Sequence, residues 1–245
     1  MDRIDIKYHN VKEEMMRNLQ ESIDGLTEHY LEMLRNVQRV LDVNLEMLKN
    51  EKFDGVLYGE CMVVEDVINA LEVKIKEDAI ISIARFQPAA GNLRLLIMII
   101  NSARLLERMG DLLKANFAII KDIEKKSPQE EKYLKTILYP MVLNIKHIFE
   151  AYIEAVIHRD EKILYGLLPQ DDEIDEISNK NIVELINLMK KSTDNVEGGT
   201  YLVLLNKKYE RFSDHVMHLV VDSVYILKGE NLRKKELLEE QKAKK

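Results

Sequence analysis

Two short strings in this chain repeat one spacing of acidic residues. LLERMGD and KYERFSD both contain Glu-Arg-x-x-Asp, 103 residues apart, so Glu107 and Asp111, and again Glu210 and Asp214, are four positions apart. On an α-helix, residues four apart project from the same face. Each pair of carboxylates could therefore ligate a metal ion, serve as an acid and base, or form salt bridges at the surface.

The residues around the first pair favour burial, which makes its charge expensive. The surrounding sequence is apolar on almost every side, as in helices that are enclosed by protein. A buried carboxylate costs several kcal/mol unless it is paired or binds a metal. Within the same helix, Arg104 and Arg108 could neutralise Glu107, and Lys114 could neutralise Asp111. A partly exposed row of salt bridges is therefore one interpretation of the pattern.

Further acids with the same spacing favour a second interpretation. Asp171 and Asp175 are four residues apart, and Glu65 is followed four residues later by Asn69. If neighbouring helices are antiparallel, these positions face the Glu-Arg-x-x-Asp acids of the next helix. Four oxygen-rich side chains would then meet at one interhelical seam. Carboxylates without compensation repel one another, so such a seam takes up protons or recruits a cation.

The types of these side chains indicate which cation the seam would hold. Oxygen ligands suit Mg²⁺, Ca²⁺, Mn²⁺ or iron, and His218, one turn after Asp214, favours a transition metal in the second half. We expect a divalent or transition metal ion (Fe, Mn, Mg or Zn). The predicted ligands are Glu65, Glu107 and Asp111 in the first half, and Asp171, Asp175, Glu210, Asp214 and His218 in the second.

The sequence gives little support to an enzyme. It contains neither G-x-G-x-x-G nor G-x-x-x-x-G-K-[ST], and no histidine follows a glutamate by three residues, as ferritin-like di-metal oxidases require. No nucleophile and base are paired, so we expect no catalytic residues. Metal-assisted hydrolysis at the acids remains an alternative of lower rank.

Composition excludes several other classes of protein. The chain has 36 basic and 43 acidic residues and a net charge of −7, which disfavours nucleic-acid binding. A single cysteine, Cys61, excludes an intramolecular disulfide and is expected to pack in the core. The longest apolar run, Leu95–Ile100, is too short to cross a bilayer, and the N-terminus lacks the apolar region of a signal peptide. We expect a cytoplasmic protein.

The spacing of apolar residues predicts an all-α fold. Nine glycines and four prolines in 245 residues leave room for long helices. Six helices are predicted: about 11–49, 55–85, 93–125, 130–158 (with Pro140 either kinking the helix or beginning its main body), Asp171 to the KKSTDNVEGG loop, and 200–228 with Gly229 as a C-cap. The basic tail, Asn231–Lys245, is interpreted as a solvated helix end.

The two halves of the chain resemble each other. Asp54 and Asp160 both precede a predicted helix, LYG occurs shortly after each, and EDVINALE from Glu65 resembles DDEIDEIS from Asp171, 106 residues later. Together with the repeated Glu-Arg-x-x-Asp, these matches predict a duplication. We expect two tandem antiparallel three-helix bundles, residues 1–126 and 127–245, joined by an exposed linker in the string KKSPQE.

The motifs also resemble a known family. ARFQPAAGNLRLLIMIINSARLLERMGDLLKANFAII is similar to the PhoU family of phosphate-signalling regulators, whose members carry Gln-Pro-x-Ala-x-Asp-Leu-Arg followed by Glu-Arg-x-x-Asp. YERFSDHVMHLVVDSVYILKGE resembles the second copy of that motif. Three departures stand out: Asn92 replaces the usual Asp, Ala115 and His218 replace an expected Asn, and Asn69 is not an acid. The first half therefore has fewer potential ligands than the second.

The resemblance implies a function as well as a fold. It implies two three-helix bundles that bind metal at the acidic motifs, and a non-enzymatic role in phosphate uptake and phosphate-starvation signalling. The implied partners are a sensor histidine kinase and the ATPase of a phosphate ABC transporter, and we also expect a homodimer that is at most peripheral to the membrane. The alternative is a PhoU-like accessory scaffold for another transporter or for metal handling.

Overall fold

The fold consists of long helices joined by short connections. The computed structural model describes the backbone of residues 2–228 and the side chains of residues 13–227. The helices are α1 (Asp2–Asn50), α2 (Gly55–Phe86), α3 (Ala90–Lys126), the 3₁₀-helix η1 (Pro128–Glu130), the π-helix η2 (Leu134–Leu138), α4 (Tyr139–His158), α5 (Glu161–Leu167), α6 (Gln170–Met189) and α7 (Asn195–Lys228). The all-α prediction is confirmed. Gly229 and the basic tail lie outside the described residues.

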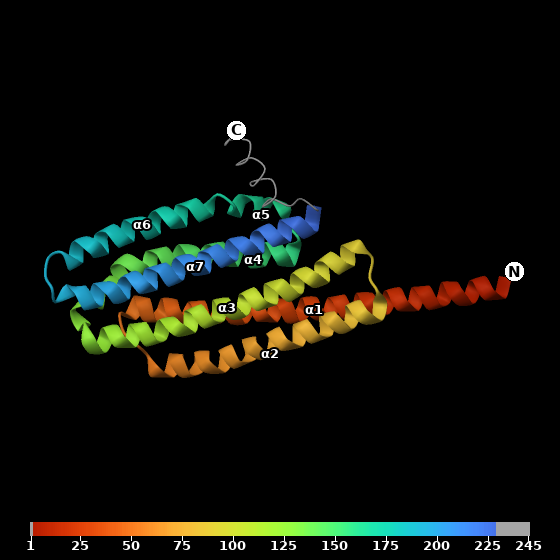
Figure 1. Cartoon of the computed structure of the whole chain (residues 1–245), viewed down its shortest axis with the longest axis horizontal. Helices are drawn as coiled ribbons and strands as arrows, with labels where there is room; N and C mark the ends of the chain where they lie inside the picture. Colours follow the sequence, from red (N-terminus) through yellow and green to blue (C-terminus); the bar gives the residue numbers. More distant parts are fainter. Residues whose placement is uncertain (1, 229–245) are drawn as a thin grey trace, which may run out of the picture.

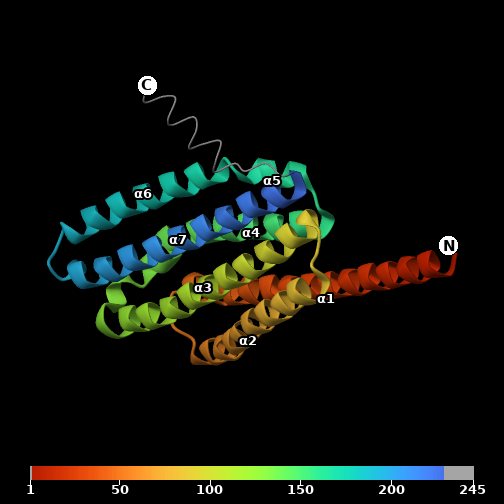
Figure 2. The same ribbon diagram turned by 45° about the vertical axis from the view of Figure 1, so that its right-hand side comes forward.

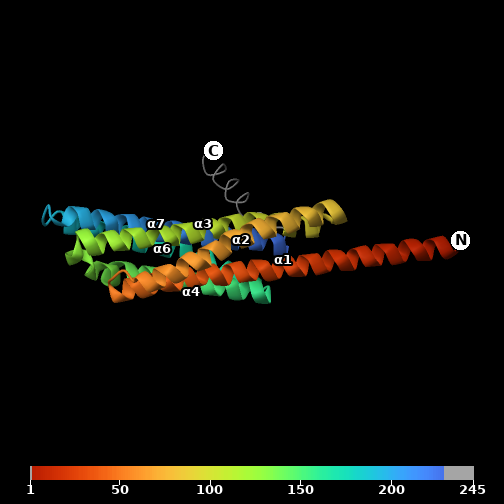
Figure 3. The same cartoon turned by 90° about the horizontal axis from the view of Figure 1, so that it is seen from below.

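Two bundles lie side by side (Figure 1). Helices α1, α2 and α3 form the first bundle, and α4 to α7 form the second. The bundles meet where α3 runs along α7, as the turned view shows (Figure 2), and where α1 packs against α4. Seen from below, the N-terminal part of α1 extends well beyond the other helices (Figure 3). No helix in the described part of the chain is long and apolar enough to cross a membrane.

The predicted duplication is visible in the way corresponding helices begin. Asp54 caps α2 and Asp160 caps α5 with the same geometry. In each case the aspartate Oδ1 accepts hydrogen bonds from the backbone N–H groups two residues later, at 2.8 Å, and three residues later, at 3.2 Å. These bonds satisfy N–H groups that have no partner within the helix. The repeated aspartate therefore starts the same helix in both halves.

The helix of the second half that corresponds to α2 is divided into two, which the prediction of six helices missed. After the cap at Asp160 the chain forms α5, stops, and resumes as α6 at Gln170, directly after Pro169. Proline has no backbone N–H and its ring clashes with the preceding turn, so it ends a helix or begins one. Pro140 has the latter role, because it lies in the first turn of α4 and begins the main body of that helix.

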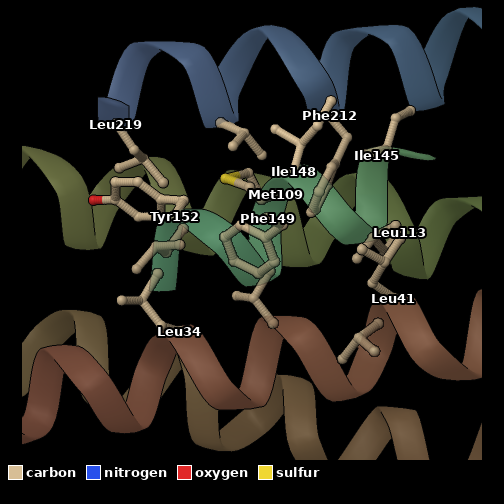
Figure 4. Packing of buried hydrophobic residues seen from close by; sticks show 14 of the residues in the cluster. Leu34, Leu41, Met109, Leu113, Ile145, Ile148, Phe149, Tyr152, Phe212 and Leu219 are labelled. Carbon is tan, nitrogen blue, oxygen red and sulfur yellow. The ribbon is translucent and has the colours of Figure 1, made fainter. Parts of the chain in front are cut away.

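One hydrophobic core runs through both bundles (Figure 4). Helix α4 supplies Phe149 and Tyr152, which point between α1, α3 and α7. Phe149 meets Phe212 of α7 edge-on, with 5.6 Å between ring centroids. Tyr152 also ties three helices together, because its hydroxyl hydrogen-bonds the Tyr30 hydroxyl of α1 at 2.7 Å and the Ser223 hydroxyl of α7 at 3.1 Å. Cys61 is buried in this core, as expected.

The linker between the bundles is exposed over most of the string KKSPQE, as expected, but two of its side chains are buried. Ser127 and Glu130 each have only 1% of their surface exposed. They lie against Gly198 in the first turn of α7: a Cβ atom at Gly198 would come within 2.7 Å of Glu130 Cγ and 2.9 Å of Ser127 Cβ. Helix α7 begins at Asn195, five residues before its predicted start, so Gly198 lies in its first turn. Both glycines of the string EGG lie within α7. A larger side chain would collide with the linker at Gly198 and with Met189 at Gly199.

We expect Gly198→Ala to destabilise the protein by about 1–3 kcal/mol, because the added methyl group overpacks the linker contact. Gly59→Ala is the matched control: it also adds a methyl group to a helix, but no atom lies within 4 Å of the new Cβ. We expect this control to be neutral or stabilising by up to about 1 kcal/mol, because alanine favours the helix. Urea unfolding of both variants measures the difference. Equal effects would show that the linker contact contributes nothing.

Candidate metal centre

In the second half, four acids approach one another across the seam between α6 and α7. Asp171 and Asp175 come from the first turns of α6, and Glu210 and Asp214 from the middle of α7. Burial, followed by the charges of Asp214 and Asp175, raises the pKa of Asp171 from 3.8 to about 6. Asp171 Oδ1 is buried and accepts no hydrogen bond from any described residue. The structure therefore brings together the four acids that the sequence predicted would meet.

The environment of Asp214 shows that His218 lies near the same seam. Burial, Asp175 and Glu210 raise the pKa of the Asp214 carboxyl, while His218 and Lys207 act in the opposite direction. His218 is exposed, and the centroid of its ring is 6.0 Å from that of His215. The imidazole is thus close enough to influence the acids.

A hydrogen-bond network that the sequence analysis missed holds Glu210 in place. Its Oε2 accepts from Ser178 Oγ at 2.8 Å and from Lys207 Nζ at 2.5 Å. Asn206 donates to Ser178 Oγ at 2.9 Å, and Asn181 donates to Asn206 Oδ1 at 3.0 Å. A signal was present in the sequence, because Asn206 stands four residues before Glu210 and so extends the row of polar residues along α7.

The side-chain chemistry of the second half suits a cation, although the potential ligands are not arranged around a single point. Within residues 13–227, no three His, Cys, Asp or Glu side chains converge closely enough to hold a metal ion. The acids lie along the seam instead. The seam nevertheless offers several carboxylate oxygens, mutual repulsion, and the buried Oδ1 of Asp171 without a donor. A hard or borderline dication would compensate all three features.

The first half has an acidic cluster with a different environment. The side chain of Glu65 is only 4% exposed, yet both of its oxygens have a donor. Lys114 Nζ lies 2.8 Å from Oε2, and Asn69 Nδ2 donates to Oε1 at 2.8 Å. Burial alone would raise the pKa of Glu65, but the contacts with Lys114 and Asn69 outweigh it and lower the pKa overall. Lys114 thus forms its ion pair across the seam with Glu65, whereas the sequence suggested Asp111 in its own helix.

Glu107 and Asp111 lie close to Glu65, as predicted. Burial, Asp111 and Glu72 raise the pKa of Glu107, and Glu65 adds to this effect, while Arg108 opposes it. The three predicted ligands of the first half therefore share one region between α2 and α3. That region already contains the ammonium group of Lys114, so its donors fit an additional cation poorly.

Comparison with known proteins decides the family. Residues 30–116 and residues 138–221 each match the family model described as the PhoU domain. The chain belongs to the PhoU family. One matched PhoU domain contains Glu65, Glu107 and Asp111, and the other contains all five predicted ligands of the second half.

Curated relatives align over most of their length. The "Phosphate-specific transport system accessory protein PhoU homolog" of Deinococcus radiodurans is 26% identical over 217 residues, which cover 88% of this chain and 99% of the relative. "Phosphate-specific transport system accessory protein PhoU homolog 1" of Thermotoga maritima is 28% identical over 204 residues, which cover 82% of this chain and 85% of the relative.

Solved structures of PhoU proteins have the same fold. The crystal structure of PhoU from Pseudomonas aeruginosa superposes with a TM-score of 0.78 at 22% identity, covering 86% of this chain and 99% of that one. The PhoU structure from Streptococcus pneumoniae, a "phosphate transport system regulatory protein", gives a TM-score of 0.72 at 21% identity, covering 86% of this chain and 98% of that one. The prediction of a PhoU-like double bundle is confirmed.

We expect the metal-free protein to lose stability as the pH rises from about 4 to about 6. The folded state binds a proton at Asp171 more tightly than the unfolded state does, because the pKa is raised from 3.8 to about 6. Its neutral form therefore stabilises the fold at low pH, and ionisation removes that contribution, by up to about 1.4 kcal/mol per unit of pKa shift.

Urea unfolding in EDTA at several pH values tests this expectation. Asp171→Asn should flatten the profile between pH 4 and 6, whereas Glu173→Gln, which removes an exposed charge from the same turn, should leave the slope unchanged. A profile of Asp171→Asn that follows the wild type would show that the seam does not hold the proton.

Proposed function

We propose that this chain is a non-enzymatic, metal-binding regulator of phosphate uptake and phosphate-starvation signalling. The observation that carries the proposal is the α6–α7 seam, where Asp171 keeps a buried oxygen without a donor among three other acids. Relatives of this chain are named as accessory proteins of the phosphate transport system. An exchangeable cation at this seam would give such a regulator an additional signal, the supply of metal.

The residues of the second half divide the task of holding the ion. Asp171, Asp175, Glu210 and Asp214 would supply oxygen ligands, and His218 a nitrogen. When bound, the cation would supply positive charge that offsets the repulsion among the acids. Ser178 and Lys207 keep Glu210 oriented toward the seam through hydrogen bonds of 2.8 and 2.5 Å. The ion would thereby fasten α6 to α7.

Helix α7 can pass the state of the seam to the rest of the protein. Tyr209, next to Glu210, donates a hydrogen bond of 2.9 Å to Asn44 of α1, and Phe212, two residues before Asp214, packs on Phe149 of α4. A shift of α7 at the seam would therefore disturb contacts that join the bundles. The proposed readers of that change are a sensor histidine kinase and the ATPase of the phosphate ABC transporter, in the cytoplasm, with the chain acting as a homodimer.

We expect Mn²⁺, Fe²⁺, Zn²⁺ or Mg²⁺ to raise the melting temperature of protein prepared in EDTA. A ligand that binds only the folded state stabilises it by about 2.7 kcal/mol when its concentration is 100 times Kd. Asp214→Asn should weaken this response, because it removes a charge from the seam while preserving the shape of the side chain. Glu107→Gln is the matched control in the first half and should retain the response. A wild-type melting curve that moves with none of the four ions would refute metal binding.

The regulatory role has a separate test in cells. Deleting the gene should switch on phosphate-starvation genes in phosphate-rich medium, because the restraint on the sensor kinase is lost. The wild-type chain should restore repression, and Asp214→Asn should restore less of it at equal protein level. A reporter for a phosphate-starvation promoter provides the measurement. Unchanged reporter expression after the deletion would assign the chain to another transporter.

A further inference from the structure

The acidic clusters of the two halves are not equivalent. At one aligned position the first half has a positively charged residue that the second half lacks. Aligning the repeats by their offsets of 106 and 103 residues pairs Glu65 with Asp171, Asn69 with Asp175, Glu107 with Glu210, Asp111 with Asp214, Lys114 with Met217, and Ala115 with His218. The first half thus has one acid fewer, no histidine, and a lysine where the second half has a buried methionine. The lysine and the missing acid reduce the need for an external cation in the first half, and the missing histidine removes a potential ligand for one.

The lysine lies where a cation is needed. Its Nζ is 2.8 Å from Oε2 of Glu65, the most deeply buried carboxylate of the first cluster, whose side chain is 4% exposed. The side chain of Lys114 is 33% exposed, and its ammonium reaches from α3 to Glu65 of α2. Asp111, one turn before Lys114, contributes further negative charge to the surroundings of the ammonium.

The corresponding place in the second half has no such group. Met217 is 5% exposed and carries no charge. Lys207 does contact Glu210, but it belongs to the same helix, its side chain is 50% exposed, and it leaves Asp171 Oδ1 without a donor. The second seam therefore keeps a buried oxygen that has no donor among the described residues, whereas both oxygens of Glu65 in the first seam have one.

We propose that the Lys114 ammonium occupies the place of the metal ion in the first PhoU domain, so that this domain is permanently neutralised and only the second domain responds to metal. This inference rests on the proposed function for the second domain. On this proposal Glu65, Glu107 and Asp111 do not ligate a metal ion, contrary to the expectation from the sequence. An ammonium has no lone pair and cannot be a ligand, and two cations on one carboxylate repel each other, so a metal ion would have to displace Lys114 from Glu65.

Lys114→Met tests this assignment, because it gives the first cluster the residue that the second already has. Without metal, the variant should be less stable than the wild type, since Glu65 is left buried without a counter-charge. With metal, the number of ions bound per chain should rise from one to two in isothermal titration calorimetry. Lys125→Met is the matched control: it removes an exposed lysine from the same helix and should leave the stoichiometry at one.

A second background separates this inference from the proposed function. In Asp214→Asn protein the second seam is impaired, so adding Lys114→Met should increase the metal response that Asp214→Asn weakens. If wild-type protein binds no metal but Lys114→Met does, the proposed function fails and the role of Lys114 stands. If the folded Lys114→Met variant binds no more metal than the wild type, the inference is overturned. A wild-type protein that binds two ions, one of them lost in Glu65→Gln, overturns it as well.

Lys114→Gln keeps the test usable if Lys114→Met does not fold without metal. Glutamine retains a donor toward Glu65 while removing the positive charge, so the fold should survive. Circular dichroism confirms folding before each titration. A gain of one bound ion in this variant supports the inference, and an unchanged stoichiometry contradicts it.

Discussion

Carboxylates buried between two helices need a positive charge beside them, and the functional architecture of this protein depends on that requirement. An unpaired charge in the interior costs several kcal/mol, which is a large part of the stability of a typical domain. The chain meets the requirement in two ways. In the first PhoU domain Lys114 lies 2.8 Å from Glu65 and lowers its pKa against the effect of burial. In the second domain no lysine of the described residues donates to Asp171 Oδ1, and the pKa of Asp171 rises to about 6. The same scaffold thus carries one cluster that is complete and one that remains open to a proton or a metal ion.

The helical frame explains how acids so far apart in sequence reach one seam. A spacing of four residues keeps each pair on one face, and the aspartate caps at Asp54 and Asp160 start corresponding helices at corresponding places. Helix α7 is central because it packs against both α6 and α3. Its acids face α6, while the neighbouring residues Tyr209 and Phe212 face the core shared by the two bundles. Binding at the seam and packing between the bundles are therefore properties of one helix, which is a physical basis for coupling the two.

Local sequence patterns were sufficient for some of these features and insufficient for others. The long helices and the meeting of Asp171, Asp175, Glu210 and Asp214 followed from periodicity and spacing, which act within a few turns. Helix α5, with seven residues, is too short to show a period, and its end depends on Pro169. At the early start of α7, Glu130 lies against Gly198, 68 positions later in the chain. Lys114 pairs with Glu65 rather than with Asp111, and this pairing is likewise a contact between two helices. Apart from the short helix α5, what the sequence did not reveal involves contacts between residues distant along the chain or on different helices.

Duplication makes this division of labour physically simple. A lysine side chain is attached to the fold, so its ammonium is present whatever the metal concentration, and the first domain stays neutralised under all such conditions. A dissociable ion depends on concentration, so the proposed metal site of the second domain would change its occupancy when the supply changes. Two open clusters would respond together and could weaken both bundles at once, because they share one core. An asymmetric pair of clusters therefore suits a regulator better than a symmetric pair, since a signal requires one part of the molecule to change relative to another that does not.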